Sequence, residues 1–370
     1  MKILYISMLY LMVGKNMREV VLVNKKKSNH YYYFNKSNGL CIRAEYPGYE
    51  EPFWAEEGPE LLDISITNYC EKNCSFCYRN SSINGQHMSL KEYESILSQL
   101  KNTHTYQIAL GGGNPNQHPD FVEILRMTRE DYGIVPSYTT NGMGLTEEII
   151  SASKLYCGAV AVSYYEPVEK FVDALVKLKS SGIKTNIHYL LTSKSIGDAI
   201  ELIESPPEYF GGVNAIVFLN YKPVGKNSDE SLLLKYSSRV EEFFVKISNH
   251  DLRKFKVGFD SCSISGIVEH LQYSPLFIES CEAGRFSAFI SENLILYPCS
   301  FMESKSNGVN LKDKSICDGW LKSEEFIAIR ESMQNNQCID TCSFAAHCSG
   351  GCTVFQEINL CESTLAKREK

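Results

Sequence analysis

The chain has 370 residues, a formal net charge of −7 and 44% hydrophobic residues. A chain of this length can bury a full core, enough for one large domain with a smaller one beside it. Its 37 Lys and Arg residues are outnumbered by 44 Asp and Glu residues and form no basic stripe. This argues against nucleic acid as a partner, because tight sequence-nonspecific binding needs clustered positive charge.

Two features bear on the compartment. Residues 3–13 are an apolar stretch of signal-peptide length, but they lack a small-residue cleavage site, and Met17 is an alternative start. The stretch is also too short to span a bilayer. The 14 cysteines of the chain have a clustered spacing that suits metal–sulfur sites, which need reduced thiols. We therefore expect a cytoplasmic protein that has no membrane partner.

Residues 1–60 are predicted to form a small β-rich lead-in. Within it, residues 31–34 and 40–43 have the composition of strands and flank an Asn-Gly turn at residues 38–39. This arrangement predicts a hairpin. Residues 47–59 are rich in Gly, Pro and Glu, which indicates a connector to the next domain.

Residues 61–260 alternate short apolar runs with amphipathic ones, which predicts parallel βα units. The predicted strands are 61–67, 106–111, 134–140, 158–164, 184–191 and 214–220, and the predicted helices are 89–101, 119–131, 146–155, 167–181 and 195–204. A further helix is predicted over 229–249, before a short strand-like run at 255–259. Six units in series predict an α/β fold with a partial (βα)6 barrel of the TIM type. Such barrels carry their chemistry on loops at the C-terminal strand ends.

The first of these loops holds Cys70, Cys74 and Cys77 at the spacing C-x3-C-x2-C. Three thiolates on one short loop can bind three irons of a [4Fe–4S] cube and leave the fourth iron open to a small molecule. The alternatives are a chance spacing and a zinc site, but zinc usually takes four ligands in paired C-x2-C spacing. The triplet therefore favours an iron–sulfur cluster.

This spacing, followed by the aromatic Tyr78, resembles the signature of the radical SAM superfamily. The resemblance implies that the open iron binds the amino and carboxylate groups of S-adenosylmethionine. One electron from the cluster would then split the sulfonium and give a 5′-deoxyadenosyl radical. An external electron donor such as flavodoxin or ferredoxin is implied as well.

The end of the second predicted strand carries Gly111, Gly112, Gly113 and Asn114. In this position the run resembles the family's GGE motif, which hydrogen-bonds the amino group of S-adenosylmethionine. Glycines let the backbone approach a ligand closely, and a plain tight turn is the alternative interpretation. Asn114 stands where the glutamate is usual, and it offers an uncharged amide oxygen as acceptor.

The later strands end in polar residues that also match the family. Asn141 ends the third strand as in the family's TNG sequence, and Ser163 resembles its ribose-contacting serine. The period of two places Asn186 and His188 on one face of the fifth strand, where His188 is either a pocket residue or a hydrogen-bonded core histidine. The run 221–225 is either a loop over the adenine or a structural turn. The resemblance thus implies these cofactor-binding residues: Tyr78, Gly111, Gly112, Asn114, Asn141, Ser163 and Asn186.

Residues 261–370 hold the second cysteine pattern. The run from Cys342 to Cys352, with Tyr297-Pro298-Cys299 upstream, resembles the SPASM domain, which carries two auxiliary [4Fe–4S] clusters. The resemblance implies that the nearer cluster is held by Cys281, Cys299 and Cys352 with Cys262 as the candidate fourth ligand, and the outer cluster by Cys338, Cys342, Cys348 and Cys361. Two zinc ribbons are the alternative, although zinc fits C-x2-C pairs better than this spacing.

Two residues depart from the family pattern in this region. Leu294 stands where a glycine usually precedes the Tyr-Pro-Cys sequence, and Ser300 stands where the sulfatase-maturing branch has a catalytic aspartate. Asp260 is then the nearest carboxylate that can take a proton, and a capping or solvated aspartate is the alternative.

The resemblance implies an oxidoreductase that abstracts hydrogen from a peptide or protein and installs a crosslink or a side-chain oxidation. Auxiliary clusters would accept the electron released as the product forms, and a separate leader-recognition protein is a possible partner. One alternative is the same chemistry on a small metabolite. Another is a non-catalytic iron–sulfur electron carrier, which would produce no 5′-deoxyadenosine. The predicted domains are a lead-in (1–60), a radical SAM barrel (61–260) and an auxiliary-cluster domain (261–370).

Overall fold

The computed structural model describes residues 20–27, 29–45, 52–272, 278–335, 338, 342, 344–348 and 350–362. The apolar stretch at 3–13 and the alternative start Met17 lie outside these residues. A mixed sheet of ten strands, in the order β10-β9-β8-β7-β6-β5-β4-β11-β12-β13, forms the centre of the molecule. A second, antiparallel sheet has the order β1-β2-β3.

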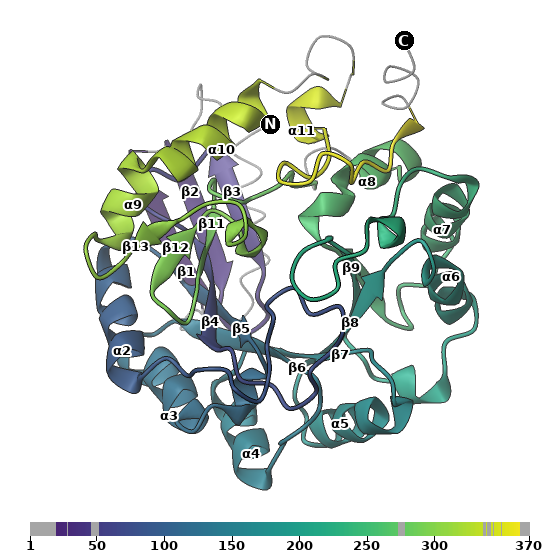
Figure 1. Cartoon of the computed structure of the whole chain (residues 1–370), viewed down its shortest axis with the longest axis horizontal. Coiled ribbons are helices and arrows are strands. Elements are labelled where there is room, and N and C mark those ends of the chain that lie inside the picture. Colours follow the sequence, from purple (N-terminus) through teal and green to yellow (C-terminus); the bar gives the residue numbers. More distant parts are fainter. Residues whose placement is uncertain are drawn as a thin grey trace.

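The central sheet contains the predicted parallel units. Its parallel strands are β4 (Leu61–Thr67), β5 (Gln107–Gly112), β6 (Val135–Thr140), β7 (Val160–Ser163), β8 (Thr185–Leu191), β9 (Ala215–Asn220) and β10 (Lys256–Phe259). The helices between them are α2 (Leu90–Gln99), α3 (Phe121–Arg126), α4 (Glu147–Tyr156), α5 (Val168–Ser180), α6 (Ile196–Glu204) and α7 (Ser238–Ser248). They surround the curved sheet on its outside (Figure 1). The predicted α/β class is confirmed.

Local sequence explains these elements. In β4, Leu62, Ile64 and Ile66 are fully buried and belong to the main hydrophobic core, while Asp63 lies between them on the other face of the strand. In α5, the buried residues Phe171, Ala174, Leu175 and Leu178 recur at helical spacing and form one stripe. The core therefore fills the layer between the sheet and the outer helices.

The strand-like run at 255–259 forms the parallel strand β10, which pairs with β9 after the six predicted units. One detail differs from the sequence-based expectation. The helix predicted over 229–249 is wrong in its first third, which holds a short 3-10 turn at Glu230–Leu232. The helix begins later because Ser237 is extended and its side chain accepts a hydrogen bond from the backbone N–H of Val240, which caps α7.

The C-terminal residues extend the same sheet. Strand β11 (Ser287–Ile290) pairs in parallel with β4, and β12 (Ile295–Tyr297) and β13 (Val309–Asn310) follow in antiparallel order. Leu294 has a φ of +63° in the turn between β11 and β12, the conformation that a glycine adopts most easily. The helices here are α8 (Ile264–His270), α9 (Ile316–Lys322), α10 (Glu324–Gln334) and α11 (Ala345–Cys348).

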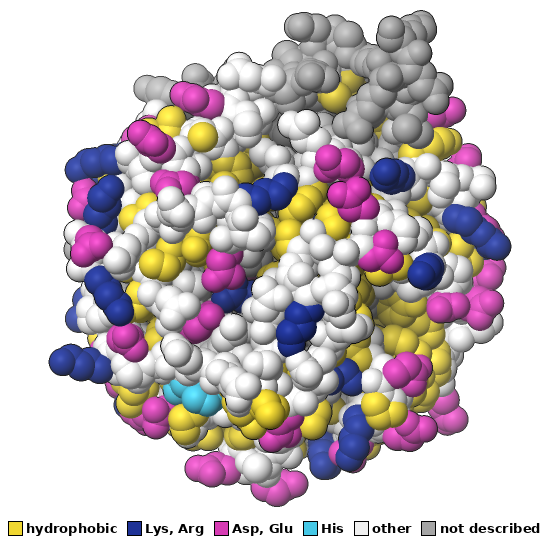
Figure 2. All heavy atoms as spheres, in the orientation of Figure 1, with side chains coloured by type: hydrophobic (Ala, Val, Ile, Leu, Met, Phe, Trp, Pro, Cys, Tyr) yellow, Lys and Arg dark blue, Asp and Glu magenta, His cyan; other side chains and the backbone are white. Residues whose placement is uncertain are grey.

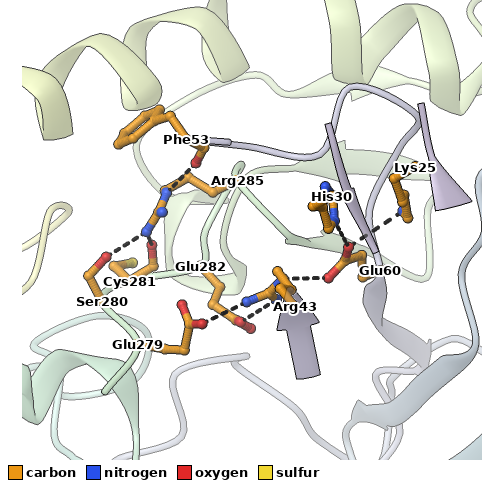
Figure 3. A network of polar contacts seen from close by, with 10 residues as sticks. All are labelled: Lys25, His30, Arg43, Phe53, Glu60, Glu279, Ser280, Cys281, Glu282 and Arg285. Atoms are coloured by element: carbon orange, nitrogen blue, oxygen red, sulfur yellow. Dashed lines mark hydrogen bonds and ion pairs between the residues drawn. The ribbon is translucent and has the colours of Figure 1, made fainter. Parts of the chain in front are cut away.

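The lead-in forms a three-stranded sheet of β1 (Val20–Lys25), β2 (His30–Asn35) and β3 (Cys41–Glu45). The predicted hairpin is confirmed, because β2 and β3 pair with Phe34 opposite Cys41. A buried network joins this sheet to the rest of the chain (Figure 3). In it, the Glu60 carboxylate contacts Lys25 at 3.5 Å, His30 at 3.2 Å and Arg43 at 2.7 Å, and Arg43 also contacts Glu279 and Glu282.

Acidic and basic side chains are mixed over the face shown in Figure 2, where apolar side chains lie among them. Within the described part of the chain, no helix combines the length and the apolar character that crossing a bilayer requires.

Candidate functional site

The loop with the first cysteine triplet follows the C-terminal end of β4. Cys70 is buried and Cys74 and Cys77 are half-buried. The Cys77 N–H donates to the Cys74 carbonyl at 3.3 Å, which curls the loop. Burial raises the pKa of Cys74, and Cys70 and Cys77 raise it further, so the three sulfur atoms are electrostatic neighbours. This donor set fits a cluster that takes three thiolates from the protein.

The glycines at the end of β5 and just after it lie beside this loop in different ways. A Cβ added at Gly111 would meet no atom within 4 Å, whereas one at Gly112 would lie 2.1 Å from the Thr67 carbonyl oxygen. Gly112 also has a φ of +110°. At Gly113, the added Cβ would lie 2.0 Å from the Tyr69 carbonyl oxygen. Gly112 and Gly113 are therefore needed for close backbone packing, and Gly111 leaves open space beside the loop.

Asn114 is only 1% exposed, and its amide is fully engaged within the protein. Its nitrogen donates to the Met143 carbonyl at 2.9 Å, and its oxygen accepts from the Thr140 hydroxyl and from the Asn141 N–H, both at 3.1 Å. The Asn141 side-chain amide in turn donates to the Cys70 sulfur at 3.4 Å. The structure thus brings Asn141 to the cysteine loop, and Asn114 holds Asn141 in place.

Tyr78 and Ser163 lie on this same side of the barrel. The Tyr78 ring packs on Phe301 at 4.8 Å between centroids, and Tyr78 hydrogen-bonds to Ser300. Ser163 ends β7, is buried and hydrogen-bonds to Tyr165, whose ring lies 5.4 Å from that of Phe76 in the cysteine loop.

Asn186 is not brought to this edge. It is the second residue of β8, and its side-chain oxygen accepts from the Asn214 amide at 2.7 Å, just before β9 begins. His188 faces the barrel interior, where its Nδ1 contacts the Thr139 hydroxyl at 3.3 Å. Burial lowers the pKa of His188 to about 4, so the ring is neutral at pH 7.

Four of the C-terminal cysteines lie together near the barrel mouth. Cys262, Cys281 and Cys352 are buried, and Cys299 is half-buried. The thiols of Cys262 and Cys352 hydrogen-bond to each other. Burial raises the pKa of Cys281 to about 11, and the nearby Cys262 raises it further. Burial raises the pKa of Cys299 to about 12, and the nearby Cys281 raises it further. Four neighbouring cysteines, three of them buried, fit a cluster held by four thiolates.

The outer cysteines also approach one another. The Cys342 N–H donates to the Cys338 carbonyl at 3.0 Å. Burial raises the pKa of Cys348 to about 11, and Cys361 and Cys338 raise it further. Gly351 links the two sets with a φ of +96°, and a Cβ there would lie 2.7 Å from the Ile358 carbonyl oxygen. In neither set do three described side chains converge as ligands of one single metal ion.

A cavity of about 850 Å³ lies between the barrel strands and the C-terminal segment. All four cysteines of the nearer set line it, together with Asp63. Asp260, the candidate base, lines it too, but its carboxylate is engaged: it accepts from the Asn220 N–H at 3.0 Å and the Asn220 side chain at 2.7 Å, and it pairs with Lys222. Asp260 is therefore not a free base.

Two residues of this cavity were missed at the sequence level. Asp63 interrupts an otherwise apolar strand, a signal that could have pointed to it. Lys222 lies in the run 221–225, where the sequence favoured no single role. Its neighbour Gly225 packs on the cysteine loop, where an added Cβ would lie 2.2 Å from the Cys77 carbonyl oxygen.

Residues 64–205 match the family model of the radical SAM superfamily. The chain is similar to a probable GTP 3′,8-cyclase of Pyrococcus abyssi, with 27% identity over 61% of this chain and 81% of the relative. It is also similar to the mycofactocin maturase MftC of Mycolicibacterium smegmatis, with 23% identity over 80% of this chain and 78% of the relative.

Solved structures share the fold. SuiB of Streptococcus suis bound to S-adenosylmethionine aligns with a TM-score of 0.68 and 17% identity, covering 93% of this chain and 98% of SuiB. The structure of native anSMEcpe with bound AdoMet and Cp18Cys peptide aligns with a TM-score of 0.62 and 17% identity, covering 84% of this chain and 95% of anSMEcpe. The family match begins in β4 and spans the cysteine loop, the Gly111 turn and Asn141. Residues 64–205 of this chain therefore carry the match to the radical SAM superfamily.

Proposed function

We propose that the chain is a radical SAM enzyme that oxidatively modifies a peptide or protein, and that it holds two auxiliary clusters besides the one that binds S-adenosylmethionine. The observation that carries this proposal is the cavity of about 850 Å³, which the four cysteines of the nearer set line together with the barrel strands. A substrate in this cavity would lie between the radical source and an electron acceptor.

The residues of the first loop fit the cofactor. Cys70, Cys74 and Cys77 would hold the cluster, and bound S-adenosylmethionine would supply a 5′-deoxyadenosyl radical when reduced. Asn141 donates a hydrogen bond to the Cys70 sulfur, which orients that ligand, and hydrogen bonds to cluster sulfurs tune the potential. Gly111 leaves room for a ligand beside the loop.

The charges of the cavity favour a peptide over a nucleotide. Its described lining is mostly apolar and includes the carboxylates of Asp63, Glu279 and Glu282. Lys222 is the one basic residue among the described lining residues, and Asp260 already pairs with it. A triphosphate is usually held by several cationic side chains, and the described lining has one, which is already paired.

Named relatives support both a peptide and a small-molecule substrate. SuiB has been solved bound to its precursor peptide SuiA, with 16% identity and a TM-score of 0.69 to this chain, and MftC is named a maturase. The similarity to probable GTP 3′,8-cyclases supports the second candidate, a radical SAM enzyme for a small metabolite. The cavity charges decide our preference for the peptide.

The test is the production of 5′-deoxyadenosine by anaerobically reconstituted protein, with synthetic peptides encoded beside the gene and with GTP as separate substrates. We expect turnover and a mass change with a peptide. The control is the Cys70→Ala, Cys74→Ala, Cys77→Ala variant, which should be inactive while it keeps its other clusters. Turnover with GTP alone would favour the metabolite enzyme, and bound iron without any 5′-deoxyadenosine would indicate an electron carrier.

A further inference from the structure

Lys222 is a buried cation beside the nearer set of cysteines. It follows β9 at the C-terminal edge of the barrel, and its side chain is only 2% exposed. A buried ammonium group is costly unless it is paired, and Asp260 after the neighbouring strand β10 supplies the partner. The Phe301 ring lies 4.7 Å from the Lys222 ammonium and helps to exclude water from it.

The carboxylate of Asp260 is also held by residues other than Lys222. Asp260 accepts from the backbone and side chain of Asn220 and from the Ser263 hydroxyl at 3.1 Å. These bonds hold the carboxylate at the end of β9 and keep the ammonium of Lys222 in one place. Lys222 is therefore a fixed positive charge and not a mobile surface side chain.

This charge faces the thiols. Lys222 interacts electrostatically with Cys262 and Cys352, and it acts on Cys299 as well. Lys222 and the four cysteines of the nearer set line the same cavity, whereas Asn220 and Ser263 also hold the Asp260 carboxylate. The positive charge of the pair therefore lies beside the site at which the nearer cluster would be held.

A charge beside an iron–sulfur cluster changes the reduction potential of that cluster. Adding an electron makes an iron–sulfur cluster more negative, and net charge, hydrogen bonding and burial set its potential. A positive charge in a poorly solvated site favours the reduced state, because Coulomb interactions are strong where the dielectric constant is low. A substrate radical that forms a new bond releases one electron and one proton, so the electron needs an acceptor close to the cavity.

We propose that Lys222 is a positioning residue that raises the reduction potential of the cluster held by Cys262, Cys281, Cys299 and Cys352, and so favours electron uptake from the substrate. The inference rests on the proposed function, because it requires this auxiliary cluster. It assigns to Lys222 an electrostatic role in the oxidative half of the reaction.

The experiment is a potentiometric titration followed by electron paramagnetic resonance, in a background in which Cys70, Cys74 and Cys77 are alanine so that only auxiliary clusters remain. We expect Lys222→Met to lower the midpoint potential of one cluster by about 59 mV or more, a tenfold change in its reduced-to-oxidised ratio. The midpoint potential of the outer cluster should stay unchanged, so this cluster serves as an internal reference. Lys222→Arg, which keeps the charge, should restore most of the potential.

Two further variants separate this role from a loss of structure. Lys222→Met leaves Asp260 buried without its cation, so the double variant Lys222→Met, Asp260→Asn removes the whole pair, and it should lower the potential as well. Lys305→Met is the matched control, since Lys305 is exposed and donates to the Val354 carbonyl at 2.9 Å beside the same cavity. Water screens its charge, so we expect no shift.

The outcomes distinguish the inference from the proposed function. About eight irons per chain in the background protein, with unchanged potentials in Lys222→Met and in the double variant, would overturn the role of Lys222 and leave the enzyme proposal standing. A background protein that binds no iron would overturn the two auxiliary clusters, and the inference would fall with them.

Discussion

At the scale of single residues, Asp63 has unfavourable surroundings for a charge. It projects from β4 into the cavity, and the described residues give it neither a hydrogen bond nor an ion pair. Burial raises the pKa of Asp63 to about 6, and the nearby Glu282 adds to the effect. The folded chain therefore holds the Asp63 proton more tightly than the unfolded chain does. Ionisation opposes folding, and its cost grows as the pH rises through the window between about 4 and 6.

We predict that Asp63→Asn makes the reconstituted protein more stable at pH 8, by roughly 1–3 kcal/mol, because one pKa unit corresponds to about 1.4 kcal/mol. The gain should be smaller at pH 5, where part of the wild-type population is already protonated. The measurement is denaturant unfolding of both proteins at the two pH values. An equal difference in the free energy of unfolding between variant and wild type at pH 5 and pH 8 would contradict the role assigned to burial. A variant that is less stable than the wild type at pH 8 would contradict it as well.

Asn114 gives a second prediction at this scale. Asn114→Glu restores the residue that the family motif usually has, yet we expect it to lower stability by roughly 1–3 kcal/mol. The carboxylate cannot donate to the Met143 carbonyl, and the longer side chain has no space in a site that is 1% exposed. Melting temperature and equilibrium dialysis of S-adenosylmethionine are the measurements. The isosteric Asn114→Asp separates charge from size, and tighter binding of S-adenosylmethionine by the glutamate variant would refute the prediction.

At the scale of elements, the sequence was informative where the signal is local. The alternation in β4 to β9 and the helical spacing of apolar residues in α2 to α6 predicted these elements within a few residues. Strands β11, β12 and β13 have four, three and two residues, too few for a period to appear. The pairing of β11 with β4 depends on contacts between distant segments, which composition does not encode.

In the candidate site too, features at strand ends were predictable from the sequence, and contacts between distant segments were not. The cysteine loop, the glycine turn and Asn141 follow consecutive strand ends, so the barrel pattern predicts that they meet. The ion pair of Lys222 and Asp260 joins two loops 38 residues apart and becomes visible only once β9 and β10 are neighbours. The place of Asn186 was not predictable either, because strand period gives the face of a residue and not its height in the barrel.

The last two residues of β5 yield a prediction that separates folding from binding. Gly112→Ala should prevent normal folding, because the added methyl group would overlap the Thr67 carbonyl and the residue has a positive φ. Gly111→Ala should fold like the wild type, since its methyl group meets no protein atom, and should weaken S-adenosylmethionine binding by tenfold or more. Soluble yield, iron content and equilibrium dialysis measure these effects. Wild-type affinity in Gly111→Ala would place the ligand elsewhere.

On the scale of the whole molecule, the C-terminal segment is not a separate appendage. Strand β11 pairs with β4 along Leu61 to Ile64. The Trp320 indole N–H donates to the Ala55 carbonyl at 2.7 Å, and the Arg330 guanidinium stacks on Trp54 at 3.6 Å. The network of Figure 3 adds Arg43, which connects β3 with Glu279 and Glu282. Lead-in, barrel and C-terminal segment therefore share one set of contacts.

The last prediction follows from this continuity. A chain that ends at residue 260 would expose the edge of β4 and the surface on which Trp320 packs, and exposed strand edges and apolar patches promote aggregation. We expect it to be insoluble, whereas a chain that ends at residue 335 keeps β11 to β13, α9 and α10 and should be soluble, with less iron than the full chain because all four cysteines of the outer set and Cys352 of the nearer set are missing. Soluble yield, light scattering and iron content are the readouts. A soluble 1–260 chain with a cooperative unfolding transition would show that the barrel folds without the C-terminal segment.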